Sequence, residues 1–138
     1  MIHINNIETD IADHCNLRCS NCSHHSPYIS KGFYDVKQFE QDIKAFGAYV
    51  QCNWFKLLGG EPLLNRDLEQ YIHILRNSNI CDKIAIFTNG TLLHRVERQT
   101  LKLVDVIVVS QYPGNSNYTN LIKQNVQKLK DINVDVIH

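Results

Sequence analysis

The sequence predicts an α/β fold built on a parallel sheet, because two kinds of segment alternate along the chain. From residues 53 to 138, short apolar and β-branched segments alternate with longer amphipathic ones, as parallel strands joined by crossover helices would. Residues 104–110, VDVIVVS, are nearly all apolar, which is typical of a strand covered on both faces. Right-handed crossovers would wind such strands into a curved sheet, a partial (β/α) barrel of about five strands.

The first predicted strand is followed by a long connection, from about Thr9 to Lys31, that has no periodicity of its own. Long ordered loops in compact domains are usually functional, so this connection is the first place to look for a site. The predicted strands, in chain order, are Ile2 to Glu8, Trp54 to Leu58, Lys83 to Thr88, Val104 to Ser110 and Asn133 to Ile137.

The clearest predicted helix lies in the segment DVKQFEQDIKAFGAYVQ, where Asp35 is placed to cap the helix start. Apolar residues at steps of three and four form one stripe along it: Val36, Phe39, Ile43, Phe46 and Val50.

Three further helices are expected between the later strands. The second opens at Asn65 and ends at residues 77–79, and a shorter third covers residues 91–101. The fourth runs from about Asn117 to Leu129. The apolar stripes that identify the second and fourth are Leu68, Ile72 and Leu75, and Tyr118, Ile122, Val126 and Leu129.

Composition and charge favour one ordinary globular domain. The chain has 138 residues, of which 43% are hydrophobic and 20% charged, and 14 Lys and Arg balance 14 Asp and Glu. Balanced, scattered charge gives no electrostatic reason to expect a nucleic acid or an anionic membrane as partner. No apolar run approaches the roughly 20 residues that span a bilayer, and no export signal is recognisable. A cytoplasmic, reducing environment is therefore expected.

Three of the five cysteines fall in one short segment, CNLRCSNC, as Cys15, Cys19 and Cys22. In a reducing compartment this clustering favours a metal site over disulfides. A structural zinc site and an electron-transfer iron–sulfur cluster both normally need four ligands, so three cysteines leave one metal position open. Zinc remains an alternative if a histidine supplies the fourth ligand. The candidate histidines are His14, His24 and His25.

The other two cysteines, Cys52 and Cys81, precede the second and third predicted strands. They should therefore lie near the amino ends of the strands, away from the cysteine-rich loop. Buried thiols without a chemical role are the expected reading.

Polar and glycine-rich motifs end the later strands. GGEP follows the second strand, TNG ends the third, and a serine ends the fourth. Open parallel sheets bind ligands at the carboxyl ends of their strands. Adjacent glycines let a ligand approach the backbone, and a glutamate suits an ammonium group. The residues concerned are Gly59, Gly60, Glu61, Asn89 and Ser110.

With the triad followed by GGEP and TNG in this order, the sequence resembles the radical S-adenosylmethionine (radical SAM) enzymes. The resemblance covers essentially the whole chain. It implies that Cys15, Cys19 and Cys22 bind three irons of a 4Fe–4S cluster. The fourth iron would bind the amino and carboxylate groups of SAM.

The resemblance also implies contacts and chemistry. Gly59, Gly60 and Glu61 would hold the methionine ammonium, and Asn89 and Ser110 would contact the carboxylate or the ribose. A reduced cluster would cleave SAM to methionine and a 5′-deoxyadenosyl radical, which abstracts hydrogen from a substrate that the sequence does not identify. A small electron-donor protein of the flavodoxin or ferredoxin type is implied as a partner.

The sequence departs from the family pattern in two ways. Asn21 stands where the family usually has an aromatic residue near adenine, and Tyr28 and Phe33 are the aromatics closest to it in sequence. The family core has six strands and five are predicted here. We therefore expect residues 1–138 to be a single core domain with its cluster loop at about residues 9–31, incomplete at the C-terminus. It would be a fragment, a core completed by a partner or by self-association, or an unusually minimal member. The alternatives are a non-catalytic module that binds zinc or a cluster, or a truncated relative.

Overall fold

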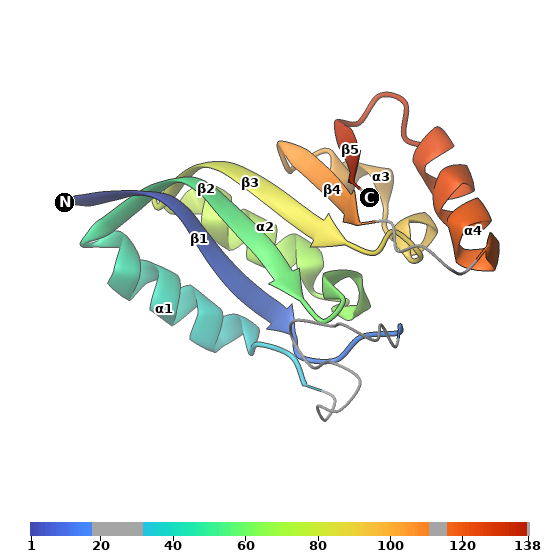
Figure 1. The fold of residues 1–138 in the computed structure, drawn as a ribbon. Helices are drawn as coiled ribbons and strands as arrows, with labels where there is room; N and C mark the ends of the chain where they lie inside the picture. The colour runs from blue at the N-terminus through green and yellow to red at the C-terminus, as the bar shows by residue number, and fades with distance from the viewer. Residues whose placement is uncertain (18–31, 111–115, 138) are drawn as a thin grey trace.

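The computed structural model describes residues 1–17, 32–110 and 116–137. Five parallel strands form one sheet in the order β1-β2-β3-β4-β5, and the sheet is strongly curved (Figure 1). This arrangement confirms the predicted α/β class and the parallel pairing of sequential strands. The strands are β1 (Ile2–Ala12), β2 (Val50–Gly59), β3 (Cys81–Thr88), β4 (Val106–Ser110) and β5 (Val134–Ile137).

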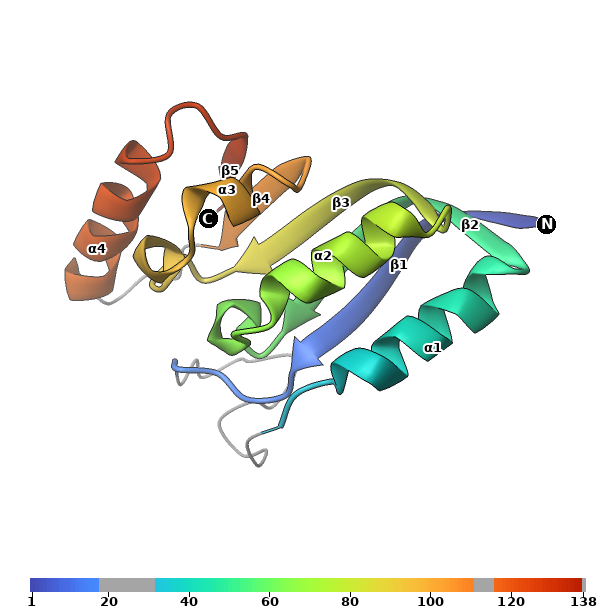
Figure 2. The same cartoon turned by 180° about the vertical axis from the view of Figure 1, so that it is seen from behind.

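Helices connect the strands and cover one face of the sheet. Helix α2 lies behind β2 and β3 in Figure 1 and in front of them in Figure 2, and α1 packs beside it, below β1 in both views. Within the described part of the chain, no helix is long and apolar enough to cross a bilayer. The helices are α1 (Val36–Gly47), α2 (Leu68–Asn77), α3 (Arg98–Leu101) and α4 (Ser116–Gln127), with 3-10 turns η2 (Pro62–Leu64) and η3 (Leu93–Arg95).

The hydrophobic core lies between these helices and the sheet. Rings from α1, α2 and β2 meet there edge to face: the centroid of Phe39 is 4.9 Å from that of Tyr71 and 6.2 Å from that of Phe55. Apolar side chains of β3 and β4 continue the core toward α4. The fully buried members include Ile11, Leu57, Ile72, Leu75, Ile84, Ile86, Leu101 and Ile107.

The first helix begins as predicted and ends earlier than its apolar stripe suggested. The Asp35 carboxylate accepts a hydrogen bond from the Gln38 N–H at 3.0 Å, which confirms the cap. Phe46, however, is 61% exposed, and Val50 belongs to β2. The Tyr49 N–H donates to the Phe46 carbonyl at 2.9 Å, which closes a turn and leads the chain directly into the strand.

Other boundaries also differ from the prediction. β1 continues to Ala12, so the cysteine-rich loop starts at residue 13 and not at Thr9. Ile11 and Ala12 at the end of β1 are fully buried, and Asn65 Nδ2 satisfies the buried Ile11 carbonyl with a hydrogen bond of 2.8 Å. Residues 91–101 form η3 and the one-turn α3 in place of a single helix. In the last stripe Tyr118 is 39% exposed, whereas Ile122 is buried.

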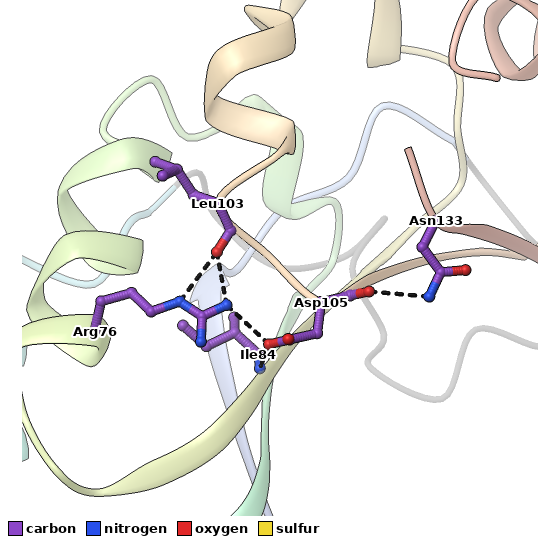
Figure 3. Close-up of polar contacts among 5 residues, drawn as sticks. All are labelled: Arg76, Ile84, Leu103, Asp105 and Asn133. Atoms are coloured by element: carbon purple, nitrogen blue, oxygen red, sulfur yellow. Dashed lines mark hydrogen bonds and ion pairs between the residues drawn. The ribbon is translucent and has the colours of Figure 1, made fainter. Parts of the chain in front are cut away.

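A polar cluster joins the amino ends of the later strands (Figure 3). The Asp105 carboxylate accepts hydrogen bonds from the Ile84 N–H and from Arg76 Nη2, both at 2.8 Å. Arg76 also donates to the Leu103 carbonyl, and Asn133 Nδ2 donates to the Asp105 carbonyl. These contacts fix α2 and the connections that lead into β4 and β5.

The two cysteines outside the triad lie near this same end of the sheet. Cys52 and Cys81 are register partners on β2 and β3. Cys52 is buried and Cys81 is half-buried. Burial raises the pKa of both thiols, that of Cys81 to about 12. Both cysteines thus lie at the amino ends of their strands, on the side of the sheet where the sequence placed them.

Candidate functional site

The candidate site lies where the carboxyl ends of β1, β2 and β3 meet (Figure 1). Backbone hydrogen bonds attach the loop after β1 to the Gly-Gly-Glu segment: the Gly60 N–H donates to the Ala12 carbonyl at 2.8 Å and the Glu61 N–H to the His14 carbonyl at 2.9 Å. Cys15 follows directly and is half-buried. The predicted residues Cys19, Asn21, Cys22, His24, His25 and Tyr28 lie outside the described part of the chain.

The first glycine of the motif is required by the packing of two strands. A Cβ atom at Gly59 would lie 2.3 Å from the carbonyl oxygen of Ala12, a separation that no side chain tolerates. Glycine therefore allows β1 and β2 to approach closely at their carboxyl ends. From the sequence, we expected this glycine because it would let a ligand approach the backbone. The structure adds a separate steric reason that was not foreseen.

Glu61 is almost completely buried, with 1% of its surface exposed. One carboxylate oxygen accepts hydrogen bonds from the Leu63 N–H at 3.1 Å and from Thr88 Oγ1 at 2.5 Å, and the other accepts one from the Asn89 N–H at 2.8 Å. Burial raises the pKa of Glu61, and these hydrogen bonds partly oppose that rise. The side chain thus joins the end of β2 to the end of β3.

Asn89 is also buried, and its carboxamide is fully hydrogen-bonded. Nδ2 donates to Asn16 Oδ1 at 2.8 Å and lies 3.8 Å from Cys15 Sγ. Oδ1 accepts from the Thr91 N–H at 3.0 Å and from Thr91 Oγ1 at 2.7 Å. A carboxamide has two donors and two acceptor positions, so every position of Asn89 is used within the protein.

Asn16 and Thr91 are the site residues that the sequence did not reveal. Asn16 Nδ2 donates to Thr91 Oγ1 at 2.8 Å, although the two residues are far apart in the chain. Each stands beside a recognised motif, Asn16 after Cys15 and Thr91 after TNG. Their position next to motif residues is the signal that would have found them.

The turn after β3 is held against β4 and α4. Gly90 has φ +80°, and a Cβ atom there would lie 2.7 Å from Val109 Cγ1. Asn125, a buried residue of α4, donates through Nδ2 to the Gly90 carbonyl at 3.0 Å. Ser110 is half-buried at the carboxyl end of β4, in register with Ile137 of β5. The predicted rim residues therefore end neighbouring strands.

Two aromatic groups border the loop that carries Cys15. Phe33 is 51% exposed and contacts the His14 ring edge to face, with centroids 4.9 Å apart. His14 Nδ1 accepts a hydrogen bond from the Gly32 N–H at 3.3 Å. A zinc site that used His14 would have to bind it through Nε2 or break this bond.

The surroundings of Cys15, the triad cysteine that the structure describes, agree with a thiolate that binds a metal cluster. Cys15 Sγ accepts a hydrogen bond from the Leu17 N–H at 3.4 Å, in addition to its contact with Asn89. N–H donors around a sulfur are typical of ligated cysteines, because they stabilise the negative charge of the thiolate. The residues described here therefore fit a cluster that the triad would hold.

Fold and site together define a partial α/β barrel whose candidate functional residues lie at the carboxyl rim of a parallel sheet. The model of the radical SAM superfamily matches residues 10–138. The chain belongs to the radical SAM superfamily, whose members are enzymes that use a 4Fe–4S cluster and SAM. The recognition made from the cysteine triad and GGEP is confirmed at the level of the family.

Curated relatives share the name GTP 3′,8-cyclase. The protein of Alkaliphilus oremlandii is 32% identical over 116 residues, which cover 80% of this chain and 36% of that protein. The protein of Actinobacillus pleuropneumoniae is 30% identical over 95 residues, covering 67% of this chain and 27% of its own. The chain thus spans about a third of the length of the relatives it matches.

Solved structures confirm the fold. BtrN, in a complex with AdoMet and 2-DOIA, superposes with a TM-score of 0.66 at 19% identity, covering 97% of this chain and 56% of that one. The protein anSMEcpe with bound AdoMet gives a TM-score of 0.72 at 19% identity, covering 98% of this chain and 43% of that one. Both similarities support the partial-barrel architecture.

Proposed function

We propose that this chain is the catalytic core of a radical SAM enzyme. Cys15, Cys19 and Cys22 would ligate a 4Fe–4S cluster, which supplies the electron that splits SAM into methionine and a 5′-deoxyadenosyl radical. The observation that carries the proposal is the position of Cys15. In a member of this family, its sulfur lies at the carboxyl rim beside the Gly-Gly-Glu segment and 3.8 Å from Asn89 Nδ2.

The rim residues would bind SAM around that cluster. Gly59, Gly60 and Glu61 are proposed to lie beside the methionine ammonium, where the buried carboxylate adds a favourable negative charge. Ser110 and Asn89 are proposed for the carboxylate or the ribose. Asn89 would have to exchange one of its internal hydrogen bonds for a bond to SAM.

The electron donor, the location, the missing strand and the first substrate to test are also proposals. A flavodoxin-type or ferredoxin-type protein would supply the electron, and an oxygen-sensitive cluster agrees with a cytoplasmic location. In the described residues β1 and β5 are the two edge strands of the sheet, and we propose that a further strand, from this protein or a partner, pairs with β5. GTP is the first substrate to assay, because the relatives named above are GTP 3′,8-cyclases.

Anaerobic reconstitution tests the proposal. The wild-type protein should take up about four irons and four sulfides and, after reduction with dithionite, convert SAM to 5′-deoxyadenosine, measured by chromatography. Cys19→Ala should abolish the cluster. Cys52→Ala is the matched control that should retain it, because that thiol lies near the amino end of β2.

Metal analysis distinguishes the alternatives. One tightly bound zinc with no sulfide would contradict the proposal and favour an interaction module. A cluster that never cleaves SAM would indicate a relative that binds the cofactor without catalysis. Repeating the assay with GTP then tests whether the activity in the relatives' name extends to this chain.

A further inference from the structure

A closed ring of hydrogen bonds lies beside the first cysteine of the triad. Asn16 Nδ2 donates to Thr91 Oγ1 at 2.8 Å, Thr91 Oγ1 donates to Asn89 Oδ1 at 2.7 Å, and Asn89 Nδ2 donates to Asn16 Oδ1 at 2.8 Å. Each of the three side chains donates once and accepts once. Because chained hydrogen bonds polarise one another, the ring holds both carboxamides in one orientation.

The ring determines which atom of Asn89 faces the sulfur. Since Oδ1 accepts two hydrogen bonds from Thr91, the amide nitrogen of Asn89 is turned toward Asn16 and Cys15. Its second N–H therefore points at Cys15 Sγ, 3.8 Å away. The Leu17 N–H approaches the same sulfur at 3.4 Å, so two donors surround it.

Burial differs between the members of the ring. Thr91 is 2% and Asn89 5% exposed, whereas Asn16 is an exposed residue. A buried hydroxyl that both donates and accepts cannot be replaced by water without rearrangement. The ring thus attaches the loop after β1 to the turn after β3, where the two buried members, Asn89 and Thr91, hold it in place.

From this arrangement we propose that Asn16 and Thr91 are positioning residues for Cys15. They aim the Asn89 N–H at the sulfur, and Asn16 Oδ1 also lies 3.9 Å from that sulfur; through these contacts they set the reduction potential of the cluster that Cys15 would ligate. Hydrogen bonds to a ligating sulfur stabilise the reduced, more negative cluster. The proposal rests on the proposed function, and it assigns roles to two residues outside the recognised motifs.

The decisive measurement is an EPR-monitored redox titration of the reconstituted protein without SAM. Thr91→Val keeps the shape of the side chain and removes the hydroxyl. We expect the equilibrium constant for reduction of its cluster to fall about tenfold, the scale of one net hydrogen bond, which is about 59 mV for a one-electron couple. Thr91→Ser restores the hydroxyl and should return the equilibrium constant for reduction to within about threefold of the wild-type value.

A second variant and a control separate positioning from stability. Asn16→Ala creates no cavity in the hydrophobic core because Asn16 is an exposed residue, and it should shift the potential in the same direction. The Asn16→Ala/Thr91→Val double variant should shift it no further, because both changes break one ring. Thr100→Val removes another buried hydroxyl, bonded to Glu69 at 3.5 Å away from the site. It should lower the melting temperature of the apoprotein without moving the potential.

The outcomes are separable. Unchanged potentials in both Asn16→Ala and Thr91→Val would overturn the positioning role while leaving the proposed function intact. Equal shifts in Thr91→Val and Thr100→Val would also overturn it, since the effect would then follow from general destabilisation. Loss of the cluster in Thr91→Val and Asn16→Ala, but not in Thr91→Ser or Thr100→Val, would support it. A wild-type protein that binds no 4Fe–4S cluster would end both proposals.

Discussion

The two ends of the sheet each use a carboxylate to connect neighbouring strands, in opposite electrostatic ways. At the amino end, Asp105 accepts the Ile84 N–H and pairs with Arg76, and both charged side chains are 35% exposed. At the carboxyl end, Glu61 is 1% exposed and accepts hydrogen bonds from two backbone N–H groups and the Thr88 hydroxyl. All of these partners of Glu61 are neutral.

The difference shows which end is built for stability alone. A solvated ion pair such as Arg76–Asp105 neutralises itself and exerts little field on its surroundings. Burial disfavours the charge of Glu61 and its hydrogen bonds favour it; in its ionised form, this carboxylate attracts a cation strongly because the surrounding dielectric is low. The charges at the amino end thus neutralise each other, and the lack of a charged partner among the hydrogen-bond donors of Glu61 supports the proposal that this carboxylate attracts the SAM ammonium.

Removing Glu61 should have the largest effect on this comparison. Glu61→Ala leaves the Leu63 and Asn89 N–H groups and the Thr88 hydroxyl without their acceptor, so we expect the apoprotein to lose about 3 kcal/mol of unfolding free energy. Urea denaturation measures this loss, with the exposed Glu40→Ala as control. A loss below about 1 kcal/mol would show that the carboxyl end does not depend on this carboxylate.

SAM binding provides a second readout on the same variant. If Glu61 attracts the ammonium, Glu61→Ala should retain the cluster and bind SAM about ten- to a hundredfold more weakly. Calorimetric titration of the reconstituted protein measures this. Unchanged affinity would leave Glu61 with a structural role only.

Acidity should next distinguish the two carboxylates. Burial raises the pKa of Glu61 above its ordinary value of 4.5, so between the two values the folded protein holds a proton that the unfolded chain has released. The stability contributed by this group is therefore full below pH 4.5 and is lost as the pH rises toward the folded pKa, by about 1.4 kcal/mol per pH unit at most.

Subtraction isolates this effect. The difference in unfolding free energy between wild type and Glu61→Ala should shrink from pH 4 to pH 6 in buffered urea titrations. A difference that grows with pH would mean that the hydrogen bonds to the carboxylate outweigh its burial.

The ion pair at the amino end should matter less. Asp105→Asn keeps an oxygen that accepts the Ile84 N–H and loses the charge that pairs with Arg76. Because the pair is one-third exposed, we expect a loss of about 1 kcal/mol and no change in iron content, measured by urea denaturation and metal analysis. Loss of the cluster in this variant would contradict the separation of the two ends.

The smallest effect is expected at the two cysteines near the amino end. Cys81→Ala should cost less than about 1 kcal/mol and leave iron and sulfide uptake unchanged. The wild-type Cys81 thiol should also react slowly with iodoacetamide at pH 8, since its pKa is raised to about 12. Reduced iron uptake in Cys81→Ala would point to a second metal site.

The order and type of the strands could be predicted because each strand is a short, apolar segment with its own pattern. The end of β1 could not, since the burial of Ile11 and Ala12 depends on Asn65 and Gly60, which arrive from elsewhere in the chain. The exposure of Phe46 could not either, because periodicity does not reveal where a helix leaves the sheet.

The candidate site shows the same division. Cys15, Glu61 and Asn89 could be selected because motif spacing and strand ends are visible in one dimension. The hydrogen-bond partners of these side chains could not be predicted, because the Thr88–Glu61 and Asn16–Thr91 hydrogen bonds form only when three strands are aligned in the sheet. The position of the candidate site could therefore be predicted from the sequence, whereas the hydrogen-bond partners of its residues could be seen only in the structure.

The 2.3 Å approach at Gly59 has a consequence for comparing relatives. The glycine is required by the spacing of two strands, whereas Cys15 is proposed to ligate the metal, so different constraints would maintain the two parts of the motif set. A relative that lost the cluster but kept this sheet would be expected to retain the glycine after its cysteines had drifted. In such a comparison, glycine at this position would indicate a shared fold, and the cysteine triad would indicate a shared cluster.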